Sequence, residues 1–362
     1  MITTVQFQVA GLTRVVDIRD TADFIALGAP APTDCVIWLH GATFDGPFML
    51  QSQVTPDARR IDVAPTGLTS DPAVGGEETW VLPGQPASPP NLVPEAVADG
   101  TVTWFHDLFF LCTIIHHIRT GPAYSAIRRI WLAGQSKGAS LTWAAYAFNN
   151  QASMLGWSSP LAFVRGYWMS CCGSPRYDDY GWDRFDAAYG SSRIDWDALG
   201  LTGGGVVTNE PRIRPCGFWH GSATGDRHSQ DFAYCKEWVE TADDLIAAHQ
   251  ALGWNDTLPG TEPATGWHTF SARPVVCTAT EHPGDAAYPD DGLVKARYAL
   301  KDPALSSAPP LPETAPVVEF EVIDGLHTWT RCLDSDPNVT EWDESMIATE
   351  FFARQPFGLG TP

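Results

Sequence analysis

The stretch "IWLAGQSKGASLTW", residues 130–143, decides the fold class. It begins as an apolar run typical of a buried strand, passes through Gly-Gln-Ser-Lys-Gly, and continues as a helix-like sequence without an intervening proline. The Gly-x-Ser-x-Gly motif alone is weak evidence, because short glycine-flanked serine motifs also occur by chance. Between a buried strand and a helix, however, it predicts a sharp turn with Ser136 at its tip.

The two glycines of the motif have a steric role in such a turn. Gly134 and Gly138 remove side chains that would collide where the strand and the helix pack. The strained turn then holds the serine hydroxyl over the carboxyl edge of the sheet, and the helix beginning at Lys137 points its free N–H groups at the same place. The sequence therefore predicts that Ser136 is a nucleophile whose oxyanion is stabilised, the alternative being a turn without chemistry.

The segments around the motif alternate between strand and helix. "TTVQFQVA" and "TRVVDIR" predict an antiparallel pair near the N-terminus. Further predicted strands cover residues 34–41, 128–134, 163–173, 212–221 and 317–329, and predicted helices cover 103–120, 137–152, 235–253 and 342–356. This order favours an α/β fold with a mostly parallel, doubly wound sheet, right-handed crossovers and helices on both faces.

The chain has 362 residues, of which 44% are hydrophobic, enough to bury a full core. Since neither an internal repeat nor an interdomain linker is visible, we expect a single domain over 1–362. Two segments, 174–211 and 254–316, are rich in glycine or proline and are expected to be excursions that shape a substrate pocket. The second is expected to be irregular apart from "ARPVVCTAT".

Charge excludes some classes of partner. Lys and Arg number 22 against 43 Asp and Glu, a net charge of −21 that repels nucleic acid and anionic lipid surfaces. Apolar stretches such as 109–115 are shorter than the roughly 20 residues of a membrane-spanning helix, so we expect a soluble protein. The first residues show no signal peptide, and both secretion and a cytoplasmic location fit the sequence.

Cysteines and histidines give no indication of a metal or another cofactor. The eight cysteines fit either disulfides or free buried thiols, and no Cys-x-x-Cys pair occurs. The ten histidines do not form a His-Glu-x-x-His spacing. The expected site therefore uses amino-acid side chains alone.

A nucleophilic serine needs a base, and the base needs an orienting acid. In this topology the acid follows a later strand and the histidine lies near the C-terminus. His327, in "VIDGLHTW", follows the last predicted strand, and Asp226, in "CGFWHGSATGD", follows the strand before it. Asp231 is the competing acid, and His268 is the competing base.

The second oxyanion donor is expected in the loop after the strand at 34–41. Gly41 allows the backbone to approach the nucleophile, so the N–H of Ala42 joins that of Lys137 in an oxyanion hole. His40 is interpreted as a brace of this loop and not as a catalyst.

These pieces together resemble a known family. "VIWLHGATFDG", "IWLAGQSKGASLTWAAYAF", "FWHGSATGD" and "EVIDGLHTW" are similar to motifs of the poly(3-hydroxybutyrate) depolymerase and feruloyl esterase group of α/β-hydrolases. The resemblance covers about 34–173, 212–253 and 317–356, and it implies that Ser136, Asp226 and His327 form the catalytic triad. The acid motif is two residues longer than the family's usual spacing.

The resemblance implies a serine esterase that acts on small or polymeric esters. Short-chain, hydroxyacid-polyester and hydroxycinnamoyl esters are the expected substrates, because aromatic residues gather in the segments that differ from the family. Those residues are Tyr167, Trp168, Tyr177, Tyr180, Trp182, Trp267 and Trp329, of which Trp267 and Trp329 are expected to bind substrate. The alternatives are a serine peptidase or amidase with the same triad, and a non-catalytic hydrolase scaffold that binds a polysaccharide or polymer.

Overall fold

The computed structural model describes residues 2–9, 11–20, 31–69, 78–82, 104–154, 159–171, 173–175, 215–221, 235–237, 268–270, 294–299, 317–322 and 344–354. The chain divides into two compact units, Met1–Ser170 and Cys171–Pro362. The expected single domain over 1–362 stays a prediction.

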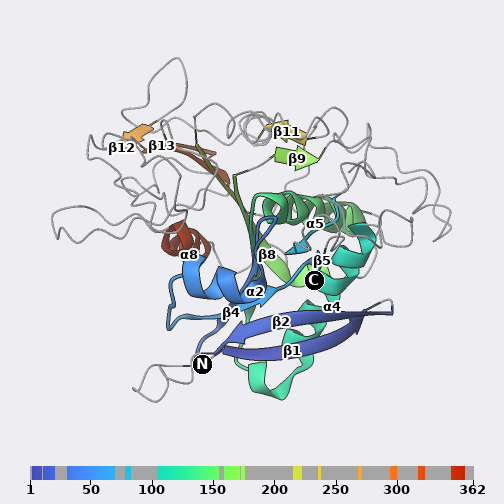
Figure 1. Cartoon of the computed structure of the whole chain (residues 1–362). Coiled ribbons are helices and arrows are strands. Elements are labelled where there is room, and N and C mark those ends of the chain that lie inside the picture. The colour runs from blue at the N-terminus through green and yellow to red at the C-terminus, as the bar shows by residue number, and fades with distance from the viewer. Residues whose placement is uncertain are drawn as a thin grey trace. The chain divides into compact units, whose positions relative to one another are not determined.

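The first unit is built on a sheet in which six described strands follow one another in a fixed order, beginning with the N-terminal strand pair drawn in dark blue in Figure 1. That order is β1 (Ile2–Val9), β2 (Leu12–Arg19), β4 (Arg60–Pro65), β3 (Asp34–Leu39), β7 (Arg129–Gln135) and β8 (Val164–Ser170). The β1–β2 pair is antiparallel, as predicted, and β4, β3, β7 and β8 run parallel to one another. The mostly parallel sheet is therefore confirmed.

Helices cover both faces of this sheet. The helix α4 (Trp104–Thr120) packs on the β1–β2 hairpin, where the carboxylate of Asp107 lies 2.7 Å from the guanidinium of Arg14. The short helix α2 (Gly46–Phe48) lies close to Asp17 of β2. Because residues three apart in a strand point to opposite sides, α4 and α2 cover opposite faces, as the doubly wound arrangement requires.

The helix α5 (Lys137–Met154) follows β7 directly and packs on β8. The rings of Tyr146 and Tyr167 meet edge to face at 5.2 Å, and Asn149 donates a hydrogen bond of 3.0 Å to the Tyr167 hydroxyl. The helices predicted at 103–120 and 137–152 are thus confirmed. Short helical turns, Met49–Gln53, Pro122–Tyr124 and Pro160–Phe163, connect the larger elements.

The strand β4 was absent from the sequence interpretation. Its sequence, Arg-Ile-Asp-Val-Ala-Pro, carries two charged residues, yet every residue of it is buried. Burial is tolerated because Arg60 donates to Asp62 at 2.6 Å and the indole of Trp38 donates to the same carboxylate oxygen at 2.9 Å. A strand whose charges neutralise each other inside the core does not produce an apolar run. The remaining pair of this unit, β5 (Leu68–Thr69) and β6 (Glu78–Thr79), is a short antiparallel ribbon.

In the second unit, four described strands lie in the order β10 (Cys216–Gly221), β14 (Val317–Val322), β13 (Val294–Ala299) and β12 (His268–Phe270). The β10–β14 pair is parallel, whereas β13 and β12 join in antiparallel fashion. The strands predicted at 212–221 and 317–329 are confirmed over 216–221 and 317–322. The predicted closing helix is α8 (Glu344–Arg354).

Two expectations for the second unit are wrong. The segment 254–316 was expected to be irregular apart from "ARPVVCTAT", but it contributes β12 and β13 to the sheet. A helix was expected to begin at residue 235, but β11 (Cys235–Glu237) pairs as a strand with β9 (Gly173–Pro175). In both cases the segment forms a strand because its backbone pairs with a partner strand, and the local sequence carries no pattern that reports this pairing. The rest of 235–253, "ARPVVCTAT" and residues 176–211 lie outside the described residues.

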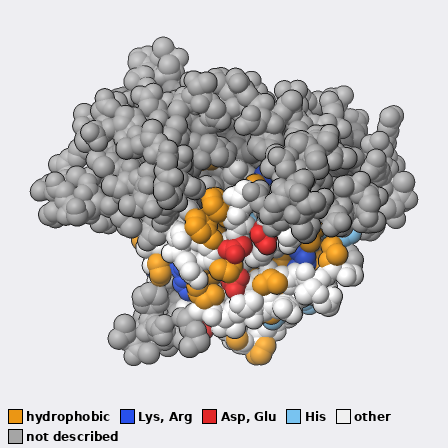
Figure 2. All heavy atoms as spheres, in the orientation of Figure 1, with side chains coloured by type: hydrophobic (Ala, Val, Ile, Leu, Met, Phe, Trp, Pro, Cys, Tyr) orange, Lys and Arg blue, Asp and Glu red, His pale blue; other side chains and the backbone are white. Residues whose placement is uncertain are grey.

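Among the described cysteines, the thiols of Cys35 and Cys112 are free. None of the helices in the described ranges combines the length and the hydropathy that a membrane crossing requires. Figure 2 shows acidic side chains next to apolar ones on the described part of one face.

Candidate active site

Ser136 is the single residue between β7, which ends at Gln135, and α5, which begins at Lys137. Its backbone lies in the left-handed region, with φ +52°, a conformation that costs a serine on the order of 1–3 kcal/mol. The turn is fixed because the Ser136 N–H donates to the Ser170 carbonyl at 2.8 Å and the Ser140 N–H donates to the Ser136 carbonyl at 3.1 Å. Ser136 is partly exposed, whereas Gln135 and Lys137 are buried.

The flanking glycines are required by the packing of this turn. A Cβ on Gly134 would lie 2.3 Å from the Gly138 carbonyl oxygen. A Cβ on Gly138 would lie 2.4 Å from the carbonyl oxygen of Leu39, at the end of β3. A side chain at either glycine would therefore collide with backbone atoms, as predicted. At Gly138 the collision would be with the neighbouring strand β3.

The loop after β3 lies directly beside the serine. A Cβ placed on Gly41 would lie 3.3 Å from the Cβ of Ser136, so the backbone approaches this serine as the sequence predicted. The Thr43 N–H donates to the Glu78 carbonyl at 3.0 Å, and the Phe44 N–H donates to the Gly41 carbonyl at 3.4 Å. The N–H of the partly exposed Ala42 has no hydrogen-bond partner among the described residues.

His40 is a structural part of this loop. Its Nε2 accepts a hydrogen bond of 2.9 Å from the Gly67 N–H, so the ring proton sits on Nδ1 and is donated to the Gly41 carbonyl at 2.6 Å. The fully buried ring packs against Trp80, whose indole donates to the His40 carbonyl at 2.8 Å. Burial lowers the pKa of His40 to about 4, and the ring is therefore neutral at pH 7. This arrangement agrees with a loop brace.

The first turn of α5 is the place predicted for the other oxyanion donor. Lys137 begins the helix, and the first four N–H groups of a helix have no carbonyl partner within it. Its side chain is completely buried. The roles of the Ala42 and Lys137 amides remain predictions.

The predicted acid and base lie outside the described residues, as do Trp267 and Trp329. The strands that precede them are described. In the β10–β14 pair, Gly221 lies opposite Val322, so the two strands end side by side. Asp226 and His327 each follow one of these ends by five residues. Their part in a triad stays a prediction, and the competitor His268 belongs to β12, where it lies opposite Ala296.

The aromatic residues near the serine differ from those predicted. Tyr167 and Trp168 were expected among the aromatic residues of a substrate cleft, but both are fully buried in β8 and belong to the core. Phe44, which the sequence interpretation did not single out, has its ring edge 3.5 Å from the position of a Gly41 Cβ. In the sequence, the only indication of Phe44 is its place three residues after the His40-Gly41 pair.

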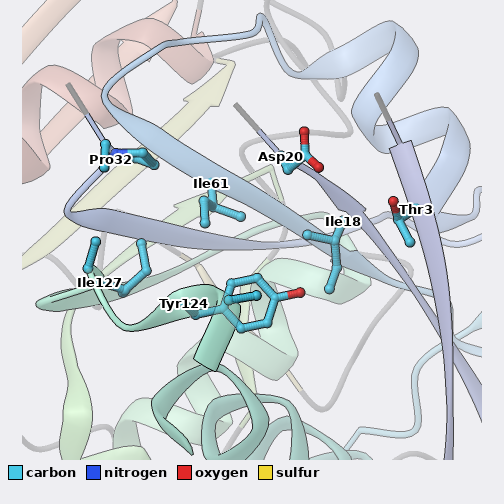
Figure 3. Close-up of a pocket in the computed structure, with 10 residues that line it drawn as sticks. Thr3, Ile18, Asp20, Pro32, Ile61, Tyr124 and Ile127 are labelled. Carbon is cyan, nitrogen blue, oxygen red and sulfur yellow. The ribbon is translucent and has the colours of Figure 1, made fainter. Parts of the chain in front are cut away.

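A described cavity of about 290 Å³ lies elsewhere in the first unit (Figure 3). Ile18, Ile61 and Ile127 line it together with Pro32 and Tyr124. Pro32 and Ile127 precede β3 and β7, which places the cavity at the amino edge of the parallel strands. Ser136 follows the carboxyl end of β7, so this cavity is not the space next to Ser136. Within the described ranges, no three His, Cys, Asp or Glu side chains gather closely enough to hold a metal ion.

Comparisons with known proteins find similarity in structure only. No protein-family model matches the sequence, and no curated protein matches it. Acyl-protein thioesterase 2 of Zea mays is 16% identical, with a TM-score of 0.36 over 64% of this chain and 84% of the thioesterase. The epoxide hydrolase VrEH1 of Vigna radiata is 17% identical, with a TM-score of 0.28 over 52% of this chain and 46% of the other. A lipase in an open form is 11% identical, with a TM-score of 0.30 over 54% and 53% of the two chains.

These identities and TM-scores are low, so the fold assignment rests on the chain itself. Parallel strands in the order β4, β3, β7 and β8 lie beside an antiparallel hairpin, and helices cover both faces. A serine with positive φ joins a central strand directly to a helix. The chain has an α/β-hydrolase fold. The narrower resemblance to depolymerases and feruloyl esterases stays a prediction.

Proposed function

We propose that the chain is a serine hydrolase that cleaves carboxylic esters through an acyl-enzyme. The observation that carries the proposal is the geometry of Ser136, a partly exposed serine with φ +52° at a strand-to-helix turn beside the Gly41 backbone. A serine gains nothing for folding from this strained backbone, and such strain is typical of catalytic sites.

The proposed mechanism begins with attack of the Ser136 Oγ on the ester carbonyl. His327 takes the Oγ proton and later returns it to the leaving alcohol, while Asp226 orients the imidazole. The N–H groups of Ala42 and Lys137 hold the oxyanion of the tetrahedral intermediate. Water then hydrolyses the acyl-enzyme by the same steps. No metal or cofactor takes part in this scheme.

The proposed substrates are short-chain, hydroxyacid-polyester or hydroxycinnamoyl esters. The resemblance of the motifs to depolymerases and feruloyl esterases supports this choice. A serine peptidase or amidase with the same triad is the second candidate within enzymes. It differs in demanding stronger protonation of the leaving group, so rates on p-nitroanilides and matched p-nitrophenyl esters separate the two.

The test of the proposal is Ser136→Ala. Ester hydrolysis should fall by about 10³-fold or more, because the variant loses the nucleophile. Folding should be unchanged, because no core volume is removed. Ser125→Ala, which removes an exposed hydroxyl from a turn, is the matched control and should retain full activity. Substantial activity in a folded Ser136→Ala variant would refute the proposal. The absence of any hydrolysis by the wild-type protein would also refute it, and is the result expected if the chain is a non-catalytic binding scaffold.

A further inference from the structure

Phe44 borders the serine from the loop after β3. The Phe44 Cδ2 lies 3.5 Å, and the Ser136 Cβ 3.3 Å, from the point that a Cβ on Gly41 would occupy. Since both atoms lie so close to one point, they are at most about 7 Å apart. The phenyl ring is therefore within reach of an acyl group attached to Ser136.

The ring is held firmly in place. It stacks on the ring of Phe48 with a centroid distance of 4.4 Å and an interplanar angle of 11°. The Phe48 N–H donates to the Asp45 carboxylate at 2.7 Å, and the Gly46 N–H donates to the Thr66 hydroxyl at 3.0 Å. If the ring moved away from a bulky ligand, it would lose its stacking on Phe48.

The Phe44 side chain is not sealed inside the core. Phe44 and Ser136 are both partly exposed, whereas Gln135, the residue before the serine, is buried. The ring edge is apolar and offers no hydrogen bond. It therefore acts on a substrate by shape, through contact with the hydrocarbon part of the acyl group.

We propose that Phe44 is a specificity-determining residue that limits the size of the acyl group accepted at Ser136. The inference rests on the proposed ester hydrolysis and adds the residue that sets the limit. A fixed ring at this distance leaves room for a short or flat acyl group and blocks a long saturated chain. One methylene more or less in such a pocket changes kcat/KM by roughly 10- to 200-fold.

The experiment measures kcat/KM for p-nitrophenyl esters from acetate to octanoate. In Phe44→Ala the ratio of octanoate to acetate should rise by about tenfold or more, because the ring no longer blocks the chain. In Phe44→Trp the same ratio should fall. Phe109→Ala is the matched control: it removes a phenyl ring that is 39% exposed on α4, and the ratio should equal that of the wild type.

Two outcomes are distinguished. An unchanged ratio in Phe44→Ala, in a protein whose hydrolysis still depends on Ser136, overturns the role of Phe44 and leaves the proposed function standing. Failure of the wild type to hydrolyse any ester overturns the proposed function and this inference together. If Phe44→Ala does not fold, Phe44→Leu and Phe44→Trp decide the same question, because they keep an apolar side chain against Phe48.

Discussion

Gly134 and Gly41 both lie close to Ser136, but a methyl group has different consequences at each. At Gly134 a Cβ would lie 2.3 Å from a backbone oxygen, which cannot move without displacing α5. At Gly41 the nearest atom is the Ser136 Cβ at 3.3 Å, a contact that a small shift relieves. We therefore expect the first glycine to be needed for folding and the second for the position of Ser136.

We therefore expect Gly41→Ala to fold with a nearly unchanged melting temperature and to lose about 10- to 100-fold in kcat, because displacements below 1 Å at a nucleophile have effects of this size. Steady-state kinetics and thermal unfolding check this result. Gly134→Ala should instead fail to fold or should unfold at a much lower temperature. Equal activity in Gly41→Ala and the wild type would show that the loop does not constrain Ser136.

Local sequence predicted Ser136, Gly134 and Gly138, because strand, turn and helix lie within one short stretch. Phe44 was missed for a physical reason. Its position depends on the register of β3 against β7, in which Leu39 lies opposite Gly134. That register brings the loop after β3 next to the serine, and no pattern within the loop reports it.

At the scale of elements, the loop after β3 depends on one neutral histidine. Burial lowers the pKa of His40 from 6.5 to about 4, while the nearby carboxylate of Asp45 raises it and the Arg14 guanidinium lowers it. The unfolded chain therefore binds a proton at this residue at a higher pH than the folded chain does. The resulting stabilisation is complete above pH 6.5 and is lost as the pH falls toward 4.

The loss predicted for His40 at pH 5 is about 2 kcal/mol of the free energy of unfolding. His40→Asn removes the titrating ring, so its free energy of unfolding should fall less between pH 7 and pH 5 than that of the wild type. Chemical denaturation at the two pH values measures the difference. An identical fall in both proteins would contradict a buried, neutral His40.

Strands with a continuous apolar run could be predicted from the sequence. Strands that depend on a pairing partner, either another strand or an opposite charge, could not. In β3, Cys35 to Leu39 are almost completely buried, and a continuous apolar run of this kind predicts a buried strand. In β4, the charges of Arg60 and Asp62 conceal the strand because they are neutralised only in the folded core. In β11, three residues at the start of a helix-like sequence become a strand by pairing with β9.

At the scale of the whole molecule, alternation of strands and helices identified the α/β class. The competition between an esterase, an amidase and a binding scaffold is not decided by the fold, since unrelated functions share it. It is decided by whether Ser136 is activated, which requires a base and an acid in reach. Asp226 and His327 each follow the end of one strand of the β10–β14 pair by five residues, and their roles as acid and base stay predictions.

The most direct test is labelling of the full chain with a fluorophosphonate, which reacts with an activated serine and not with an ordinary one. We expect one adduct per chain, located on Ser136 by peptide mass spectrometry, absent in Ser136→Ala and present in Ser125→Ala. His327→Ala and Asp226→Asn should slow labelling, because the hydroxyl loses its base or the orientation of that base. An adduct on a different residue, or no adduct on the folded wild-type protein, would contradict Ser136 as the nucleophile.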